Sequence, residues 1–411
     1  MRDSLLRSPR LPTILVLAVG VPSYGALLVS VLMANGISLP GGGVLGGDFI
    51  AFWTAARAVW GGGYPGIYDP AAFEAAVAST GAALGAGTER FGLTWQYPPH
   101  AMLAAAPLGL LPYGLAYAAF AGGGLAAFAF ALRGAGGVRV GTMLLVLASP
   151  ALFQTVVCGQ LGAWVGALML GALLLPDRRP VLAGVCAGLL TIKPQLGVLI
   201  PIVYLAGGHR AAFAAAAGTA LGLAGLSLAV FGAPAWTAFA DQVLGVAEGV
   251  GAAAYPLAKM PTVFAALRTL GAPASLAAGL QGAAALAAVV ACWRLWRQGS
   301  EGREGRTLRE KAAITAGLAF LCTPYAYYYD APVLALTFLI AARGTDARAP
   351  VRLAALALCF GAPLFMVGPA SPVGAQLGLG AVLLLTALAA RSDLLRTPFR
   401  TPGRPGAPAS A

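Results

Sequence analysis

Long apolar runs separated by short polar connections make up most of the chain. Dividing it at charged residues, prolines and glycines gives twelve runs that we expect to form membrane-spanning helices. A span needs about 20 apolar residues, and several runs are shorter, which predicts paired or half-inserted helices. The second run is longer, and we expect a half-inserted piece that ends near Pro112, followed by a true span. The runs cover residues 11–34, 100–132, 139–157, 159–176, 180–192, 194–207, 211–232, 274–298, 311–324, 330–343, 351–368 and 373–390.

The composition supports an all-α integral membrane protein. Hydrophobic residues make up 59% of the 411 positions and charged residues 10%, and the mean hydropathy is +0.81, which is too apolar for a soluble globule of this length. Ala, Leu and Gly run continuously instead of alternating with polar residues, which favours helices over a β-barrel. We therefore predict one integral domain over residues 1–396 and a disordered cytoplasmic tail over the Pro-rich, basic residues 397–411.

The distribution of positive charge predicts the orientation. If the N-terminus is cytoplasmic, the inner connections hold 21 of the 26 Lys and Arg residues, whereas the 14 acidic residues divide equally between the two faces. This asymmetry follows the positive-inside rule and places both termini in the cytoplasm. Two outer loops are then substantial, residues 35–99 and 233–273, and we expect interfacial helices in both. Arg2, Arg7 and Arg10 precede an apolar stretch longer than a signal-peptide core, so we expect it to be the first membrane helix.

Several classes of ligand have no matching motif. The basic residues form no patches interleaved with aromatics, which argues against nucleic acid. There is no Asp-x-Asp motif, no GxxxxGK[ST] loop and no His/Cys cluster, so neither a nucleotide nor a metal is expected, and no cofactor is predicted. The five cysteines lie in or beside apolar segments and form no CxxC pair.

Asp48 is the first candidate for chemistry. It follows Gly46 and Gly47 close to the predicted end of a membrane helix, where a carboxylate loses hydration. It could act as a general base that takes a proton from an acceptor hydroxyl. The alternative is a structural N-cap for the following segment, FIAFWTAARAVW.

The outer cations are candidates for binding an anion. Lys193 lies in TIKPQLG between two short apolar runs and could bind a phosphate, or its side chain could snorkel to the surface. Pro194 breaks the helix, so Lys193 and Gln195 are expected to project from a turn. Lys259 could assist with the phosphate, although surface solvation is an alternative, and Arg57 is a further outer cation predicted to bind substrate.

Four more outer residues are candidates for binding a sugar. Asp330 ends TPYAYYYD and could hydrogen-bond sugar hydroxyls while Tyr328 and its neighbours stack on the ring; the alternative is an aromatic belt. Gln160, in CGQLGAW, could hold a sugar or satisfy a backbone group. His100 follows Tyr97-Pro98-Pro99 and could bind substrate or act as a structural cap.

These motifs occur in an order that resembles glycosyltransferase family 87, the polyprenol-phosphate-mannose-dependent α-mannosyltransferase type with a GT-C membrane fold. The resemblance covers about residues 10–390 and rests on GGDFIAFWTAARAVWGGGYPGIYD, QYPPHAMLAAAPLGLLP, GQLGAW, AGLLTIKPQLGVLIP and TPYAYYYDAPVL. In such enzymes an acid in the first outer loop is the base, and this role transfers to Asp48. The KPQ segment matches at Lys193, Pro194 and Gln195. Many members have a histidine in the segment that here is TPYAYYYD, so no role of that histidine transfers.

The resemblance implies an inverting, metal-independent transfer at the outer face of the cytoplasmic membrane. A hexose, with mannose as the expected sugar, would move from a polyprenyl-phosphate carrier to a lipid-linked or envelope glycan acceptor among the membrane lipids. A lipid or lipid-linked sugar transporter without chemistry is the main alternative, and a non-catalytic scaffold is another. A transporter would place its functional acids at mid-membrane depth, whereas the candidate acids here cluster at one face.

Overall fold

The protein is built almost entirely from helices. The computed structural model describes residues 21–33, 37–39, 43–44, 46–85, 93–134, 140–251, 255–298, 306–342, 350–366 and 373–391. Within them the predicted all-helical architecture is confirmed, apart from a hairpin of two two-residue strands in the predicted first outer loop. The predicted tail at residues 397–411 and the start of the first predicted span lie outside the described residues.

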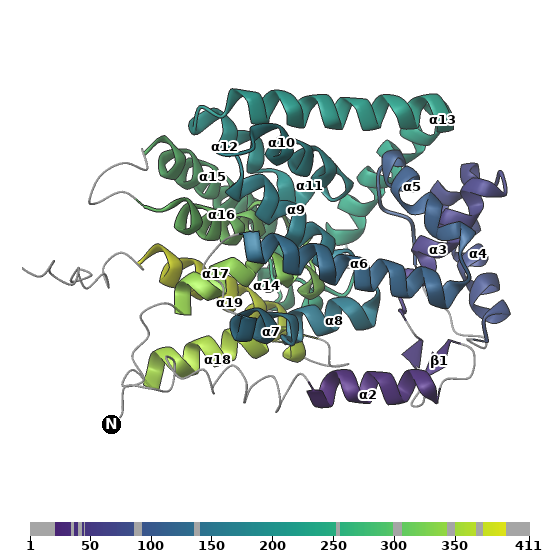
Figure 1. The fold of residues 1–411 in the computed structure, drawn as a ribbon, viewed down its shortest axis with the longest axis horizontal. Coiled ribbons are helices and arrows are strands. Elements are labelled where there is room, and N and C mark those ends of the chain that lie inside the picture. Colours follow the sequence, from purple (N-terminus) through teal and green to yellow (C-terminus); the bar gives the residue numbers. More distant parts are fainter. Residues whose placement is uncertain are drawn as a thin grey trace, which may run out of the picture.

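The first quarter of the described chain forms a group of short helices toward one end of the molecule (Figure 1). Proline and glycine divide it: Pro70 and Pro99 begin helices, and Asp69 caps one by accepting bonds from the N–H groups of Ala71 and Ala72. The elements are α2 (Val21–Leu32), β1 (Ser38–Leu39), β2 (Gly43–Val44), α3 (Phe49–Trp60), η2 (Tyr64–Tyr68), α4 (Pro70–Ala83), α5 (Pro99–Ala105) and η3 (Ala106–Leu110).

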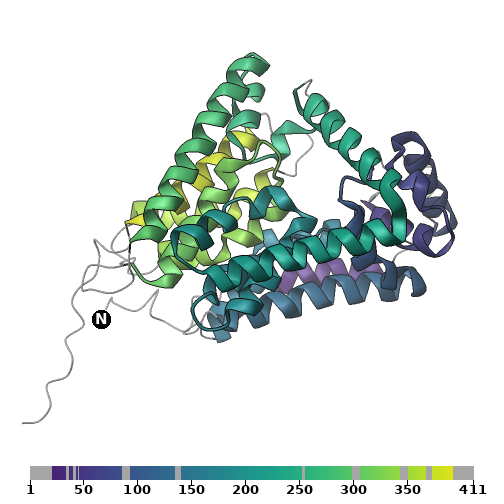
Figure 2. The ribbon, with the colours of Figure 1, turned by 90° about the horizontal axis from the view of Figure 1, so that it is seen from above.

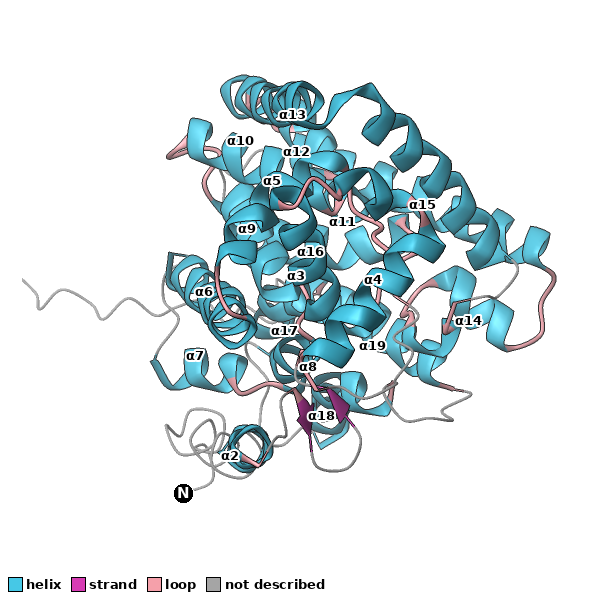
Figure 3. Cartoon of the chain, turned by 90° about the vertical axis from the view of Figure 1, so that its right-hand side faces the viewer, coloured by secondary structure: helices cyan, strands magenta, loops and turns pink. Residues whose placement is uncertain are grey.

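The antiparallel pairing of β1 and β2 joins Ser38 to Val44 and Leu39 to Gly43. Figure 3 draws this hairpin in magenta at the lower edge of the helical body. These strands are not predictable from the sequence, because GGGVL has no alternating polar and apolar pattern.

The middle of the chain crosses the molecule repeatedly through helices that prolines interrupt. Pro112 separates η3 from α6, as the sequence predicts, and Ser149 caps the helix that begins at Pro150. The elements are α6 (Tyr113–Gly134), α7 (Val140–Leu147), α8 (Pro150–Cys158), α9 (Gly162–Leu174), α10 (Pro180–Leu189), η4 (Leu190–Ile192), α11 (Pro194–Gly197) and α12 (Ile200–Ala206).

The last part begins with one long helix that bends and returns toward the outer loops (Figure 2). The bend lies at Gly232, whose φ of 77° lies in the left-handed region, next to Pro234. Thr307 and Glu310 form a capping box at the start of α16. The elements are α13 (Arg210–Gly251), η5 (Leu257–Lys259), α14 (Val263–Thr269), α15 (Ala274–Arg297), α16 (Leu308–Cys322), η6 (Tyr328–Leu334), α17 (Ala335–Ala342), α18 (Pro350–Phe365) and α19 (Gly374–Ala390).

Two apolar cores hold these helices together. The larger is in the bundle where α9 packs against α6, α10 and η6, and where α16 packs against α15, α17 and α19. The smaller is in the outer segments, where Phe49, Phe52, Trp95 and Phe120 pack around one another. The first outer loop is therefore a packed helical unit with its own core, fixed against α6.

The predicted number of twelve spans is not confirmed. Among the described residues, three helices are long and apolar enough to cross a membrane, Tyr113–Gly134, Arg210–Gly245 and Ala274–Arg297. A fourth span results if α7 and α8, bent by 47° at their junction, count as one. The other predicted runs that lie within the described chain correspond to helices of 17 residues or fewer.

Candidate functional site

A polar cavity of about 480 Å³ lies where the predicted outer segments meet the helical bundle. Its lining comes from the start of α3, the strip before α5, the α8–α9 turn, the KPQ turn, η5 and the aromatic segment before η6. Six of the nine predicted site residues line it: Asp48, Gln160, Lys193, Gln195, Lys259 and Tyr328. Segments more than 200 residues apart in sequence therefore contribute to one site.

Two glycines bring Asp48 into the cavity. Gly46 (φ 62°) precedes it, and Gly159 (φ 70°) ends α8 as its left-handed C-cap. A Cβ on Gly159 would meet the Cβ of Phe49 at 2.5 Å and the Cα of Gly46 at 3.1 Å, so only glycine allows the two turns to touch. The contact is closed by the Asp48 N–H, which donates to the Cys158 carbonyl at 2.8 Å.

The Asp48 carboxylate does not act as a helix cap. Asp48 occupies the N-cap position of α3, but its side chain makes no capping hydrogen bond. Instead its Oδ2 accepts a hydrogen bond of 2.7 Å from the amide Nε2 of Gln160. The structural alternative of an N-cap is therefore wrong, and the carboxylate is available to the cavity that it lines.

The surroundings of Asp48 favour a base of raised proton affinity. Burial raises the pKa of Asp48, and this effect exceeds the opposing effects of the Gln160 hydrogen bond and of the positive charges on Lys259 and Lys193. A carboxylate with a raised pKa is a better proton acceptor than an exposed one. The geometry thus fits the predicted role of general base.

Lys193 projects from the predicted break in the helix. It lies between η4 and α11, with Pro194 as the first residue of α11, so the expectation of a turn at KPQ is confirmed. Its ammonium group lies 2.5 Å from Oδ1 of Asp330, and the two residues are 4% and 0% exposed. Asp330 also accepts a hydrogen bond from the Tyr327 N–H at 3.0 Å. The Lys193 charge is therefore compensated within the protein, and surface snorkelling is wrong.

Lys259 supplies the second positive charge of the cavity. It ends η5 and is partly exposed to the cavity that it lines. Within the described part of the chain, no carboxylate forms an ion pair with it. Lys259 is consequently better suited than Lys193 to meet an anionic group that enters from outside.

Tyrosine rings form one wall of the cavity. Tyr255, Tyr325 and Tyr327 pack edge to face at centroid distances of 5.7 and 5.3 Å, and Tyr329 stacks on Tyr327 at 5.0 Å. The Tyr328 hydroxyl lies 3.1 Å from the Cys158 sulfur. All five rings line the cavity, so they do not form an aromatic belt that faces lipid.

Comparison with known proteins agrees with the motifs. The sequence profile described as glycosyltransferase family 87 matches residues 95–324. The chain belongs to glycosyltransferase family 87. No curated protein and no solved structure matches it. The matched region contains most of the cavity lining, including Gln160, Lys193 and Lys259, so the polar cavity is the natural candidate for the active site of this family 87 protein.

Three predicted residues of this family 87 member lie elsewhere. Asp330 is completely buried beneath the cavity in the ion pair with Lys193, so it is not placed to meet a sugar. His100 is 5% exposed, where its Nε2 contacts the Thr191 hydroxyl at 3.1 Å and its ring stacks on Trp236. Neither residue lines the cavity.

Arg57 also fails to reach the cavity. It is nine residues after Asp48 along α3, which corresponds to roughly 13 Å of helix. The side chain is exposed, and its guanidinium lies 4.9 Å from the centre of the Trp53 ring. The rise of the helix therefore carries Arg57 away from the carboxylate at the start of α3.

Several lining residues were not predicted as site residues. Tyr97 donates its hydroxyl hydrogen to Gln160, and Gln96 donates to the hydroxyls of Thr94 and Tyr255. The motif QYPPH contains both residues, and the two prolines that follow hold the strip before α5 extended. The signal in the sequence was this polar pair, Gln96 and Tyr97, directly before two prolines at the start of the QYPPH motif.

An apolar groove adjoins the cavity. It measures about 780 Å³ and lies between the second half of α13 and α15, the two helices that converge at the top of Figure 2. Gln96, Pro194, Gln195 and Tyr325 line both the groove and the polar cavity, so the two spaces are continuous. Ala274, Ala278, Gly282 and Ala285 form the α15 wall of the groove, on a helix long enough to cross a membrane.

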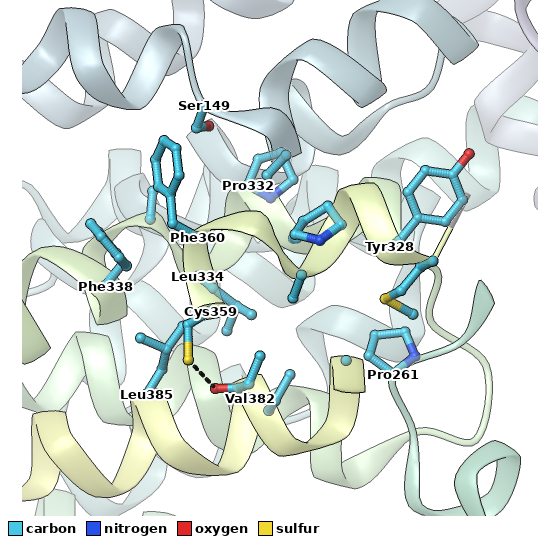
Figure 4. Close-up of a pocket in the computed structure, with 18 of the residues that line it drawn as sticks. Ser149, Pro261, Tyr328, Pro332, Leu334, Phe338, Cys359, Phe360, Val382 and Leu385 are labelled. Atoms are coloured by element: carbon cyan, nitrogen blue, oxygen red, sulfur yellow. Dashed lines mark hydrogen bonds between the residues drawn. The ribbon is translucent and has the colours of Figure 1, made fainter. Parts of the chain in front are cut away.

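A third space, of about 70 Å³, lies on the other side of Tyr328. Figure 4 shows it between Phe338, Phe360 and Leu385, with Tyr328 at its edge. Its lining is almost wholly apolar, and its volume is small. We consider it a packing cavity of the core and not part of the candidate site.

Proposed function

We propose that this family 87 glycosyltransferase moves a hexose, with mannose as the expected sugar, from a polyprenyl-phosphate carrier to a lipid-linked or glycan acceptor. The transfer occurs at the outer face of the cytoplasmic membrane, in a GT-C-type arrangement of about twelve membrane helices. What carries the proposal is the meeting of Asp48 and Lys259 in one cavity that opens into an apolar groove beside α15. Such a space matches a substrate with a polar phosphosugar head and a hydrocarbon chain.

The reaction is a direct displacement. Asp48 removes the proton from an acceptor hydroxyl as that oxygen forms a bond to the anomeric carbon. The bond between the anomeric carbon and the phosphate oxygen breaks, and the lipid phosphate leaves with the bonding electrons. Attack from the face opposite the leaving group inverts the anomeric configuration.

The protein side chains stabilise the charge that develops on the departing phosphate. Lys259 contacts this anion directly, and Lys193 adds positive potential from beneath the cavity while Asp330 fixes its position. The ammonium group of Lys259 supplies most of this charge, because that of Lys193 is already paired with Asp330, and the proposed step requires no metal ion. Gln195 and the tyrosine wall orient the sugar.

Incubation of the purified protein with a radiolabelled polyprenyl-phosphate mannose and a membrane lipid extract tests this function. We expect a labelled glycoside of inverted configuration and release of the unlabelled lipid phosphate. Vesicles that contain the protein and the labelled donor serve as the second arm. Movement of the intact donor between leaflets without any product would contradict the proposal in favour of a transporter.

A further inference from the structure

A chain of two hydrogen bonds connects Tyr97 to Asp48 through Gln160. The Tyr97 hydroxyl donates to Oε1 of Gln160 at 3.2 Å, and Nε2 of Gln160 donates to Oδ2 of Asp48 at 2.7 Å. A carboxylate accepts hydrogen bonds and an amide nitrogen only donates, so the opposite orientation of the Gln160 amide would place its oxygen against the carboxylate. The two partners together specify one orientation of this side chain.

Gln160 and Tyr97, the two residues of this chain that hold Asp48, have rigid surroundings. Gln160 is 9% exposed, and its N–H donates to the Thr155 carbonyl at 3.0 Å immediately after the left-handed Gly159. The Tyr97 ring packs on Phe52 and Trp95 at centroid distances of 5.0 and 5.1 Å.

The backbone of Tyr97 is fixed as well, because its carbonyl accepts a hydrogen bond from the Tyr68 hydroxyl at 2.8 Å. The hydrogen-bond chain thus has anchors in η2, in the strip before α5 and in the α8–α9 turn. Tyr97 and Gln160 therefore lose little rotational freedom when they hold the carboxylate.

We propose that Tyr97 and Gln160 are positioning residues that occupy Oδ2 of Asp48 and leave Oδ1 as the proton-accepting atom. Among the described residues, no side chain or backbone group donates to Oδ1, and Asp48 lines the cavity. One oxygen is therefore assigned to orientation and the other to chemistry. This inference rests on the proposed function, in which Asp48 is the base, and it replaces the expectation that Gln160 holds the sugar.

Other ionisable groups near Asp48 bear on its titration. Lys259 and Lys193 favour its charged form, and the nearby groups that share the cavity are Cys158 and the hydroxyls of Tyr97, Tyr327, Tyr328 and Tyr329. The Gln160 hydrogen bond is the contact that lowers the pKa of Asp48 most directly. Loss of this bond is therefore expected to move the acidic limb of the rate profile to higher pH.

The test measures kcat, KM for the labelled donor, and the pH dependence of kcat/KM in Gln160→Met and Tyr97→Phe. Methionine keeps the length of glutamine without its amide. We expect kcat to fall on the order of tenfold or more in Gln160→Met, and less in Tyr97→Phe, with KM within about twofold. Both acidic limbs should move to higher pH, further in Gln160→Met. Gln160→Glu, which places a second carboxylate beside Asp48, should move the limb in the same direction.

Tyr204→Phe is the matched control. It removes a buried hydroxyl that donates to the Ala172 and Ala183 carbonyls, and Tyr204 does not line the cavity. It should leave kcat and the acidic limb unchanged even if the melting temperature falls. Tyr97→Phe removes a single oxygen atom and carries the test if Gln160→Met does not fold.

The outcomes separate this inference from the proposed function. Unchanged kcat and pH profiles in Tyr97→Phe and Gln160→Met, with Asp48→Asn inactive, would overturn the positioning role and leave the base in place. A raised KM with unchanged kcat would also overturn it and assign Gln160 to sugar binding. Full activity of Asp48→Asn would overturn the proposed function itself.

Discussion

The ammonium nitrogen of Lys193 lies 2.5 Å from Oδ1 of Asp330, and neither side chain is more than 5% exposed. The pair joins the KPQ turn to the aromatic segment 137 residues later in the chain. Lys193 thereby stabilises the floor of the cavity with a charge that is already compensated. Of the two cavity-lining lysines, Lys259 is the one without a carboxylate partner among the described residues.

Removal of one partner of this pair should destabilise the fold. We expect Lys193→Met to lower the free energy of unfolding by about 3–5 kcal/mol, because the Asp330 carboxylate is left buried without a counter-charge. The double variant Lys193→Met/Asp330→Asn should recover most of this loss, since asparagine keeps an oxygen for the Tyr327 N–H. Thermal unfolding in lipid nanodiscs measures both. A double variant as unstable as the sum of the single variants would contradict the pairing.

Lys259 should matter for the donor, and Arg57 should not. Both are cations of the outer segments, but only Lys259 lines the cavity, whereas Arg57 is exposed and stacks on Trp53. We expect Lys259→Gln to reduce kcat/KM by on the order of 100-fold, because it removes a cation from the departing phosphate. Arg57→Gln should change kcat/KM by less than about twofold. Equal losses in the two variants would show that general surface charge, and not the cavity, attracts the donor.

The helical class and the breaks at Pro112 and Pro194 were predictable from the sequence. Proline positions and apolar runs are local signals, and the distribution of positive charge placed Asp48, Gln160 and Lys193 on the same predicted face. The number of complete spans was not predictable in the same way. The run 139–157 is long by composition, yet a turn at Pro150 divides it into two helices bent by 47°, and packing against other helices decides that geometry.

The partners of the site residues were also beyond the sequence. The contact of Tyr97 with Gln160 spans 63 residues, and no periodicity relates positions so far apart. Arg57 shows a different error, because its charge in the predicted outer loop suggested a role in substrate binding, whereas the rise of α3 carries it away from the cavity.

The charge on Asp48 should reduce stability at neutral pH. Burial raises the pKa of Asp48 above its unfolded value of about 3.8, so the folded protein holds this proton more tightly than the unfolded chain. The resulting stability is fully present below the unfolded pKa and is lost as the pH rises through the folded pKa. Asn cannot ionise, so Asp48→Asn should melt at a higher temperature than the unmodified protein at pH 7. This difference should shrink as the pH falls, and a difference that does not change with pH would contradict a buried, ionising carboxylate.

Gly159 should tolerate no side chain. Alanine at this position would have to adopt a left-handed backbone conformation, which costs about 1–2 kcal/mol. Its Cβ would also lie 2.5 Å from the Cβ of Phe49. We expect Gly159→Ala to lose most of its transfer activity, because the clash moves Asp48 and Gln160 apart. Gly208→Ala is the control, since Gly208 has a φ of 74° but no atom within 4 Å of the position that a Cβ would take. Gly208→Ala should lose stability through the same backbone strain and keep its transfer activity. Inactivity of both variants would point to general misfolding.

Asp48 as the base is the centre of this account, and the rate of sugar transfer by Asp48→Asn tests it most directly. Asparagine keeps the shape of the side chain and a contact to Gln160, but it cannot take the proton from the acceptor hydroxyl. The measurement is the initial rate of labelled product formation, made on folded protein verified by its melting curve. We predict a rate at least about 1,000-fold below that of the unmodified protein, with donor binding retained. Transfer by Asp48→Asn at a rate close to that of the unmodified protein would contradict the account.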